Sequence, residues 1–109
     1  MSAARAAKLS RIPGVTIAEA CARFGVTKAA VTRARRDPAS QPTLDELAVA
    51  ALTVNGSRKE GTLDLAPIAR WLDYVDHSAY SADEIRAMLA RCPQLAIDGD
   101  RWTLTAPWP

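Results

Sequence analysis

The chain has 109 residues, of which 49% are hydrophobic and 24% charged, and its net charge is +2. This composition is typical of a folded protein rather than a disordered tail, and the length allows one modest core or two small ones, which excludes a large enzyme with a separate cofactor domain. Residues 1–42 carry eight basic and two acidic side chains (+6), whereas residues 43–109 carry six and ten (−4). Only the first part is suited to bind a polyanion.

The amino-terminal segment lacks the apolar run of an export signal, because Arg5, Lys8 and Arg11 interrupt it. No other run reaches the length of a membrane span. We therefore expect a cytoplasmic protein with no membrane partner. The two cysteines, Cys21 and Cys92, are too few for a disulfide scaffold and are expected to be reduced core thiols.

The first predicted element is a helix over residues 3–11, with Ser2 as its cap. Arg5, Lys8 and Arg11 recur at intervals of three and form a basic stripe along it. Such a stripe is commonly a solvated face, but beside a second basic helix it is also a candidate for phosphate contact. Pro13 and Gly14 then break the chain.

Residues 16–37 predict two helices joined by a sharp turn. Thr16 and Glu19 have the spacing of a capping box, and Gly25 permits the positive φ that such a turn requires. Thr27 can cap a second helix over residues 28–36, which Asp37 and Pro38 end. The apolar residues expected to face inward are Ile17, Ala20, Cys21 and Phe24 on the first helix and Ala30, Val31 and Ala34 on the second.

This pattern resembles the helix-turn-helix of DNA-binding regulators such as phage repressors, recombinases and transposases. Gly25 and Val26 match its turn, Val31 its branched core position, and Cys21 replaces the small residue, most often alanine, where the helices cross. The resemblance implies that helix 28–36 reads the major groove. The implied DNA contacts are Thr27, Lys28, Ala29, Thr32, Arg33, Arg35 and Arg36, with Arg5, Lys8, Arg11 and Arg23 as possible phosphate contacts. The alternative is structural: short helix pairs with a glycine between them are common in all-α proteins, and these two helices form such a pair.

Residues 38–42 are expected to be a short linker, after which Thr43 and Glu46 predict another capped helix that ends at Asn55 and Gly56. A short strand is expected over residues 62–65. A helix should then start near Pro67 and end near Asp76.

Ser81 and Glu84 predict one more capped helix, which Pro93 closes. The last segment predicts a hairpin, in which a loop of two or four residues near Asp98 and Gly99 places four apolar side chains on one face. These side chains are Leu95, Ile97, Trp102 and Leu104.

The order of elements over residues 43–105 resembles that of a winged-helix domain, in which the third helix reads the groove and the hairpin is the wing. Asp83 and Glu84 lie at the start of that third helix and repel phosphate. Only Arg86, Arg91 and Arg101 favour DNA there. We therefore expect this unit to act in protein contact or dimerisation.

No constellation of catalytic or metal-binding residues is evident in the sequence. His77 is the only histidine and is expected to be a solvated loop residue, and a catalytic pair with Cys92 lacks an orienting group. No spacing of Cys and His suits zinc, and no glycine-rich phosphate loop is present. We expect a non-enzymatic protein without a metal or cofactor.

The sequence thus predicts a mainly α fold: a trihelical helix-turn-helix unit (residues 1–37), a linker (38–42) and a winged-helix-like unit with a carboxyl-terminal hairpin (43–109). The leading hypothesis is a transcriptional regulator that binds double-stranded DNA, with a protein partner or homodimer formed through residues 43–109. One alternative is a protein-interaction adaptor without DNA contact. Another is that both units bind DNA in tandem.

Overall fold

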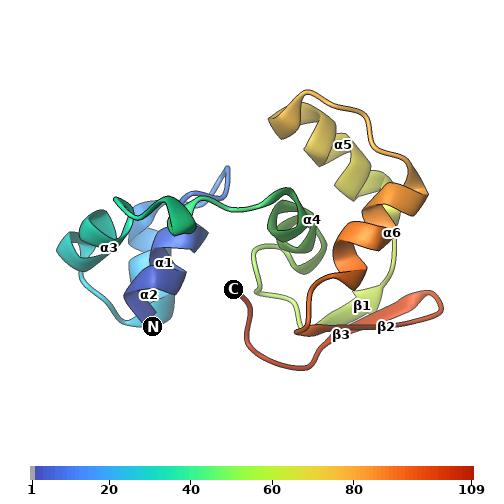
Figure 1. The fold of residues 1–109 in the computed structure, drawn as a ribbon. Coiled ribbons are helices and arrows are strands. Elements are labelled where there is room, and N and C mark those ends of the chain that lie inside the picture. Colours follow the sequence, from blue (N-terminus) through green and yellow to red (C-terminus); the bar gives the residue numbers. More distant parts are fainter. Residues whose placement is uncertain (1) are drawn as a thin grey trace. The chain divides into compact units, whose positions relative to one another are not determined.

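The structure is a computed structural model that describes residues 2–109. It is mainly helical, as expected for the fold class, and contains one small antiparallel sheet of three strands. The described residues divide into two compact units, residues 2–43 with Pro109 and residues 44–108. Figure 1 colours residues 2–43 from blue to green and residues 44–108 from green to red. Within the described residues, no helix has the length and apolar character needed to cross a membrane.

Three helices form the first unit: α1 (Ser2–Ser10), α2 (Ile17–Phe24) and α3 (Lys28–Ala34). Helix α1 packs against both of the others. The buried apolar side chains of this unit are Ala6, Ala7, Leu9, Ile12, Ala20 and Val31. Several of them are small, so the helices can approach one another closely without leaving voids.

The local signals that predicted α2 and α3 are confirmed. The Thr16 hydroxyl accepts a hydrogen bond from the Glu19 amide (3.1 Å), and the Glu19 carboxylate accepts one from the Thr16 amide (3.4 Å). Gly25 ends α2 with a φ of 63°. The Thr27 hydroxyl caps α3 by accepting from the Ala30 amide at 3.2 Å. Each of these bonds joins residues a few positions apart, so the sequence pattern alone specifies them.

The boundaries of the first unit differ from the prediction in four places. Helix α1 begins at Ser2, which is therefore not its cap, and ends at Ser10, one residue earlier than expected. Helix α3 ends at Ala34, two residues earlier than expected. The expected linker contains a short 3₁₀ helix, η1 (Pro38–Ser40), which packs against α1 and buries Ser40. The reason is local, since the Asp37 carboxylate accepts from the Ala39 amide at 2.9 Å and so starts a new turn.

The second unit combines α4 (Leu44–Thr53), α5 (Leu65–Asp76) and α6 (Ala82–Ala90) with strands β1 (Glu60–Thr62), β2 (Leu95–Asp98) and β3 (Arg101–Leu104). The helices pack against one another and lie on one side of the sheet, whose strand order is β1-β3-β2 (Figure 1). The buried apolar residues of this unit are Ala48, Val49, Ala50, Leu52, Leu63, Ile68, Leu72, Ile85, Met88, Leu89, Cys92, Trp102 and Trp108.

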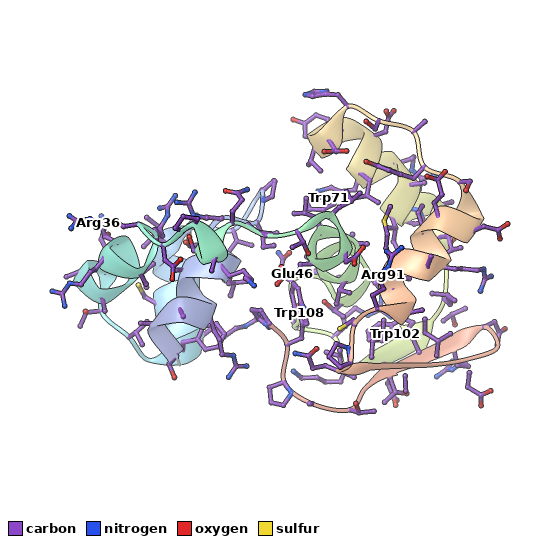
Figure 2. The ribbon with its side chains drawn as sticks, viewed as in Figure 1. Arg36, Glu46, Trp71, Arg91, Trp102 and Trp108 are labelled. Atoms are coloured by element: carbon purple, nitrogen blue, oxygen red, sulfur yellow. The ribbon has the colours of Figure 1, made fainter. Side chains whose placement is uncertain are left out.

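The carboxyl-terminal hairpin has one of the two registers that the sequence allows. Leu95 pairs with Leu104 and Ile97 with Trp102, so the four side chains share a face. The loop has two residues, and its first, Gly99, has a φ of 61°. Trp102 projects from β3 toward the helices and is almost completely buried (Figure 2). The wide side chain therefore anchors the sheet to the helical layer.

The short strand and the start of α5 were predicted wrongly. The strand covers Glu60–Thr62 instead of residues 62–65, and α5 begins at Leu65, two residues before Pro67. Asp64 is the cause, because its carboxylate accepts from the Ala66 amide at 3.2 Å and starts the helix early. Pro67 is tolerated because the first amides of a helix have no intrahelical acceptor.

Helix α4 ends at Thr53, and three consecutive residues with positive φ follow it, where the sequence predicted the helix end at Asn55 and Gly56. Val54, Asn55 and Gly56 have φ values of 51°, 59° and 85°. The buried Thr53 hydroxyl holds this turn, donating to Val49 O and accepting from the Gly56 amide, both at 2.8 Å. Val54 is strained, because the left-handed region is unfavourable for a β-branched residue.

Candidate nucleic-acid interface

Helix α3 has one buried face and one exposed face. Val31 is fully buried, and Ala30 and Ala34 are half-buried. The exposed side chains of α3 and its flanking turns are Thr27, Lys28, Ala29, Thr32, Arg33 and Arg36. The faces predicted from the sequence are therefore confirmed, whereas contact with DNA remains a prediction.

The exposed face of α3 is strongly basic. It carries Lys28 and Arg33, and Arg36 follows in the turn after the helix, where Figure 2 labels it. Residues 27–36 contain no acidic side chain. Arg35, the carboxyl-terminal cap of α3, is half-buried, and its amide donates to Val31 O at 2.9 Å. The positive charge of this face is thus concentrated at Lys28, Arg33 and Arg36, a set that we call the α3 basic face.

The residues expected to contact phosphate have different environments. Arg23 is exposed in the last turn of α2, whereas Lys8 is half-buried. Arg5 is also half-buried, and its guanidinium carbon lies 5.0 Å from the centre of the Phe24 ring. This cation–π contact joins α1 to α2. Arg5 therefore has a packing role within the first unit that the sequence did not reveal.

Arg11 donates hydrogen bonds to three acceptors within the first unit. Its Nε binds the Ser40 hydroxyl at 3.0 Å, its Nη2 binds Arg35 O at 2.7 Å, and its Nη1 binds the Gln41 side-chain oxygen at 3.3 Å. The guanidinium thereby joins the end of α1 to the end of α3 and to η1. Sequence reasoning missed this arrangement because the acceptors lie 24 to 30 positions away and none of them is a carboxylate.

The charges of the second unit are arranged differently. The capping box at the start of α6 is confirmed, with the Ser81 hydroxyl and the Glu84 amide 3.1 Å apart. Asp83 and Glu84 place negative charge at that end of α6. Arg91, at the other end, forms an ion pair with Asp45 at 2.8 Å. Arg86 and Arg101 are exposed, and each follows an acidic residue in the sequence, Glu84 and Asp100 respectively.

The cysteine, histidine and acidic side chains of the described residues are not gathered in one place. Among residues 2–109, no group of three or more His, Cys, Asp or Glu side chains is placed to hold a metal ion. His77 is exposed and ends α5 with a φ of 55°. Cys21 is half-buried, and burial raises the pKa of the Cys92 thiol.

Comparisons of the chain with protein-family models, with curated proteins and with solved structures found no significant match. The arrangement of its own side chains is therefore the basis for a functional proposal.

Proposed function

We propose that the chain is a small, non-enzymatic DNA-binding protein that places the exposed face of α3 in the major groove of a duplex. The observation that carries this proposal is the α3 basic face, whose three side chains are exposed, whereas Val31 of the same helix is fully buried. A single α-helix fits the major groove, and arginine can form two hydrogen bonds to one guanine. Arg33 is the base-reading residue in this proposal, and Thr32 offers a hydroxyl or a methyl group to a neighbouring base.

The geometry of the first unit supports this function beyond the charge of one helix. Thr16 and Thr27 cap the two helices, and Gly25 makes the turn between them, as in the helix-turn-helix that the sequence resembles. Arg23, Lys28 and Arg36 would then contact phosphates on the rims of the groove. Transcriptional regulation is the process that we propose for such a protein.

The second unit is proposed to assemble the protein, as a dimer or with a partner. Its element order and its β1-β3-β2 sheet support a winged-helix-like arrangement. Helix α6 would be the reading helix of that arrangement, but Asp83 and Glu84 at its start disfavour an approach to phosphate. A single helix-turn-helix covers few base pairs, so assembly through this unit would supply the missing affinity.

An adaptor that contacts only proteins is the second candidate. It is favoured by two large apolar side chains of the second unit, Tyr74 and Val54, which are 79% and 52% exposed. In that case the α3 basic face would meet an acidic protein surface rather than a nucleic acid.

Selection from a random duplex library with the full chain separates these functions. DNA reading by α3 predicts an enriched motif, whose symmetry and half-site spacing also report the oligomeric state. The adaptor predicts no enrichment over the starting library. Arg33→Ala serves as the matched control, because it removes the base-reading side chain and leaves the buried face of α3 intact.

A further inference from the structure

We propose that Arg11 is a positioning residue that fixes the carboxyl-terminal end of α3, where Arg33 and Arg36 lie, rather than a ligand of DNA phosphate. This inference rests on the proposed function, because it concerns how the α3 basic face is held for binding. It departs from the sequence pattern, in which Arg11 belongs to the same basic stripe as Arg5 and Lys8.

The first step is the chemistry of the three acceptors. A helix leaves its last carbonyl groups without intrahelical donors, and Arg11 Nη2 supplies a donor to one of them, Arg35 O, at 2.7 Å. A cation is also favourable at this end of a helix, where the carbonyl dipoles point outward. The charged donor therefore stabilises α3 where Arg33 and Arg36 project.

The second step is the way in which η1 completes the arrangement. The Ser40 hydroxyl accepts from Arg11 Nε at 3.0 Å and donates to Asp37 O at 2.7 Å. Ser40 is buried, so water cannot easily replace these bonds. The turn over residues 35–37, which includes Arg36, is thus held from both sides, by Arg11 and by Ser40.

The third step is the orientation of the guanidinium. All three of its nitrogens donate to acceptors within the unit, with Gln41 receiving the third bond at 3.3 Å. A phosphate contact would have to compete with these bonds or use the remaining hydrogens of a half-buried group. The planar fork is the essential feature, since a lysine has the same charge but cannot reach three separated acceptors.

Duplex binding by full-length wild type, Arg11→Lys and Arg11→Gln, measured over a salt series, tests the inference. Positioning predicts that both variants lose about tenfold in affinity and that the salt slope of Arg11→Gln equals that of the wild type. A direct phosphate contact predicts that Arg11→Lys binds like the wild type. It also predicts that Arg11→Gln makes the negative slope of log affinity against log salt shallower by about 0.9. Either of these last results would overturn the inference.

Ser40→Ala provides a second test that leaves every charge in place and remains informative if the Arg11 variants fail to fold. It should weaken duplex binding in the same direction as Arg11→Lys, and Ala39→Ser, at the exposed neighbouring position, is its control. Normal binding by a folded Ser40→Ala would contradict the positioning role. If the wild type itself binds no duplex, the proposed function fails, whereas equal binding by the wild type and Arg11→Lys refutes the positioning role alone.

Discussion

Gly61 and Trp102 are paired across β1 and β3, and a Cβ atom at position 61 would lie only 3.1 Å from the indole nitrogen of Trp102. The same atom would lie 2.5 Å from Nη2 of Arg58. Because position 61 has no side chain, the Arg58 guanidinium can close over the indole, with its carbon 5.7 Å from the ring centre. Gly61 therefore serves close packing here rather than a turn.

Gly61→Ala should lower the free energy of unfolding by about 1–2 kcal/mol, because the new methyl group displaces Arg58 and crowds Trp102. Urea denaturation measures this change. Glycine-to-alanine substitutions at compatible positions stabilise proteins instead, so unchanged or increased stability would show that the contact is not tight.

A double-mutant cycle locates the cause of that loss. Arg58→Ala alone should cost about 0.5–1 kcal/mol through the lost cation–π contact. In this background Gly61→Ala should cost less than in the wild type, since the nearest clashing atom is gone. Additive effects would contradict the geometry described for these residues.

Val54→Asn should raise the free energy of unfolding by about 0.5–1 kcal/mol, because asparagine adopts the left-handed backbone of this position more readily than valine. The side chain is 52% exposed, so little apolar burial is lost. Val54→Ala is the control, since it removes only the β-branching and should give a smaller gain. A destabilised Val54→Asn, measured by thermal unfolding, would indicate that Val54 makes an important contact.

Cys92 should react with iodoacetamide more slowly than Cys21 in the folded protein at pH 8, because burial covers its thiol and raises its pKa. Peptide mass spectrometry resolves the two sites. Unfolding in urea should bring the two rates together. Equal rates in the folded protein would contradict the burial of Cys92.

The raised pKa of Cys92 also predicts a dependence of stability on pH. Above about pH 8.5 the unfolded thiol loses its proton while the folded one keeps it, so stability should fall as pH rises further. Tyr80, whose pKa is raised by its hydrogen bond to Asp76, acts with the same sign. Comparison with Cys92→Ala isolates the thiol, and identical pH profiles for the two proteins would refute its contribution.

Arg33→Ala should weaken binding to a selected duplex by about 1–3 kcal/mol, because the proposed contact to guanine is lost. Arg70→Ala is the matched control, since Arg70 is also an exposed arginine on a helix but belongs to α5 in the second unit. Fluorescence anisotropy measures both variants. Equal losses in the two would place the binding surface elsewhere.

The parts of the fold that depend on neighbouring residues followed from the sequence. The capping boxes at Thr16 and Ser81 involve bonds over three positions, and the shared face of Ile97 and Trp102 follows from the alternation along the hairpin. The alternation left two registers open, and the structure has one of them. Two local signals were missed: Asp37 starts η1 within the expected linker, and Asp64 starts α5 in a segment where Pro67 offered a competing helix start.

The parts that depend on contacts between distant residues did not follow from it. The spacing of Arg11 fits an exposed stripe, and only the folded chain brings Arg35 and Ser40 to its guanidinium. Likewise, nothing in the order of residues shows that Arg5 lies over Phe24. The α3 basic face was predictable because the exposure of residues on a helix follows from their periodicity. The contacts of Arg11 and Arg5 were not, because they join residues far apart in the sequence.

The affinity of the full chain for random-sequence duplex DNA, measured by anisotropy as salt is raised, tests the central claim most directly. Four exposed basic side chains, Arg23, Lys28, Arg33 and Arg36, line the proposed interface. Counterion release then predicts an affinity that is measurable at low salt and falls with a log–log slope between about −2 and −4. No binding at low salt, or binding with a slope near zero, would contradict the proposal that this protein binds DNA through α3.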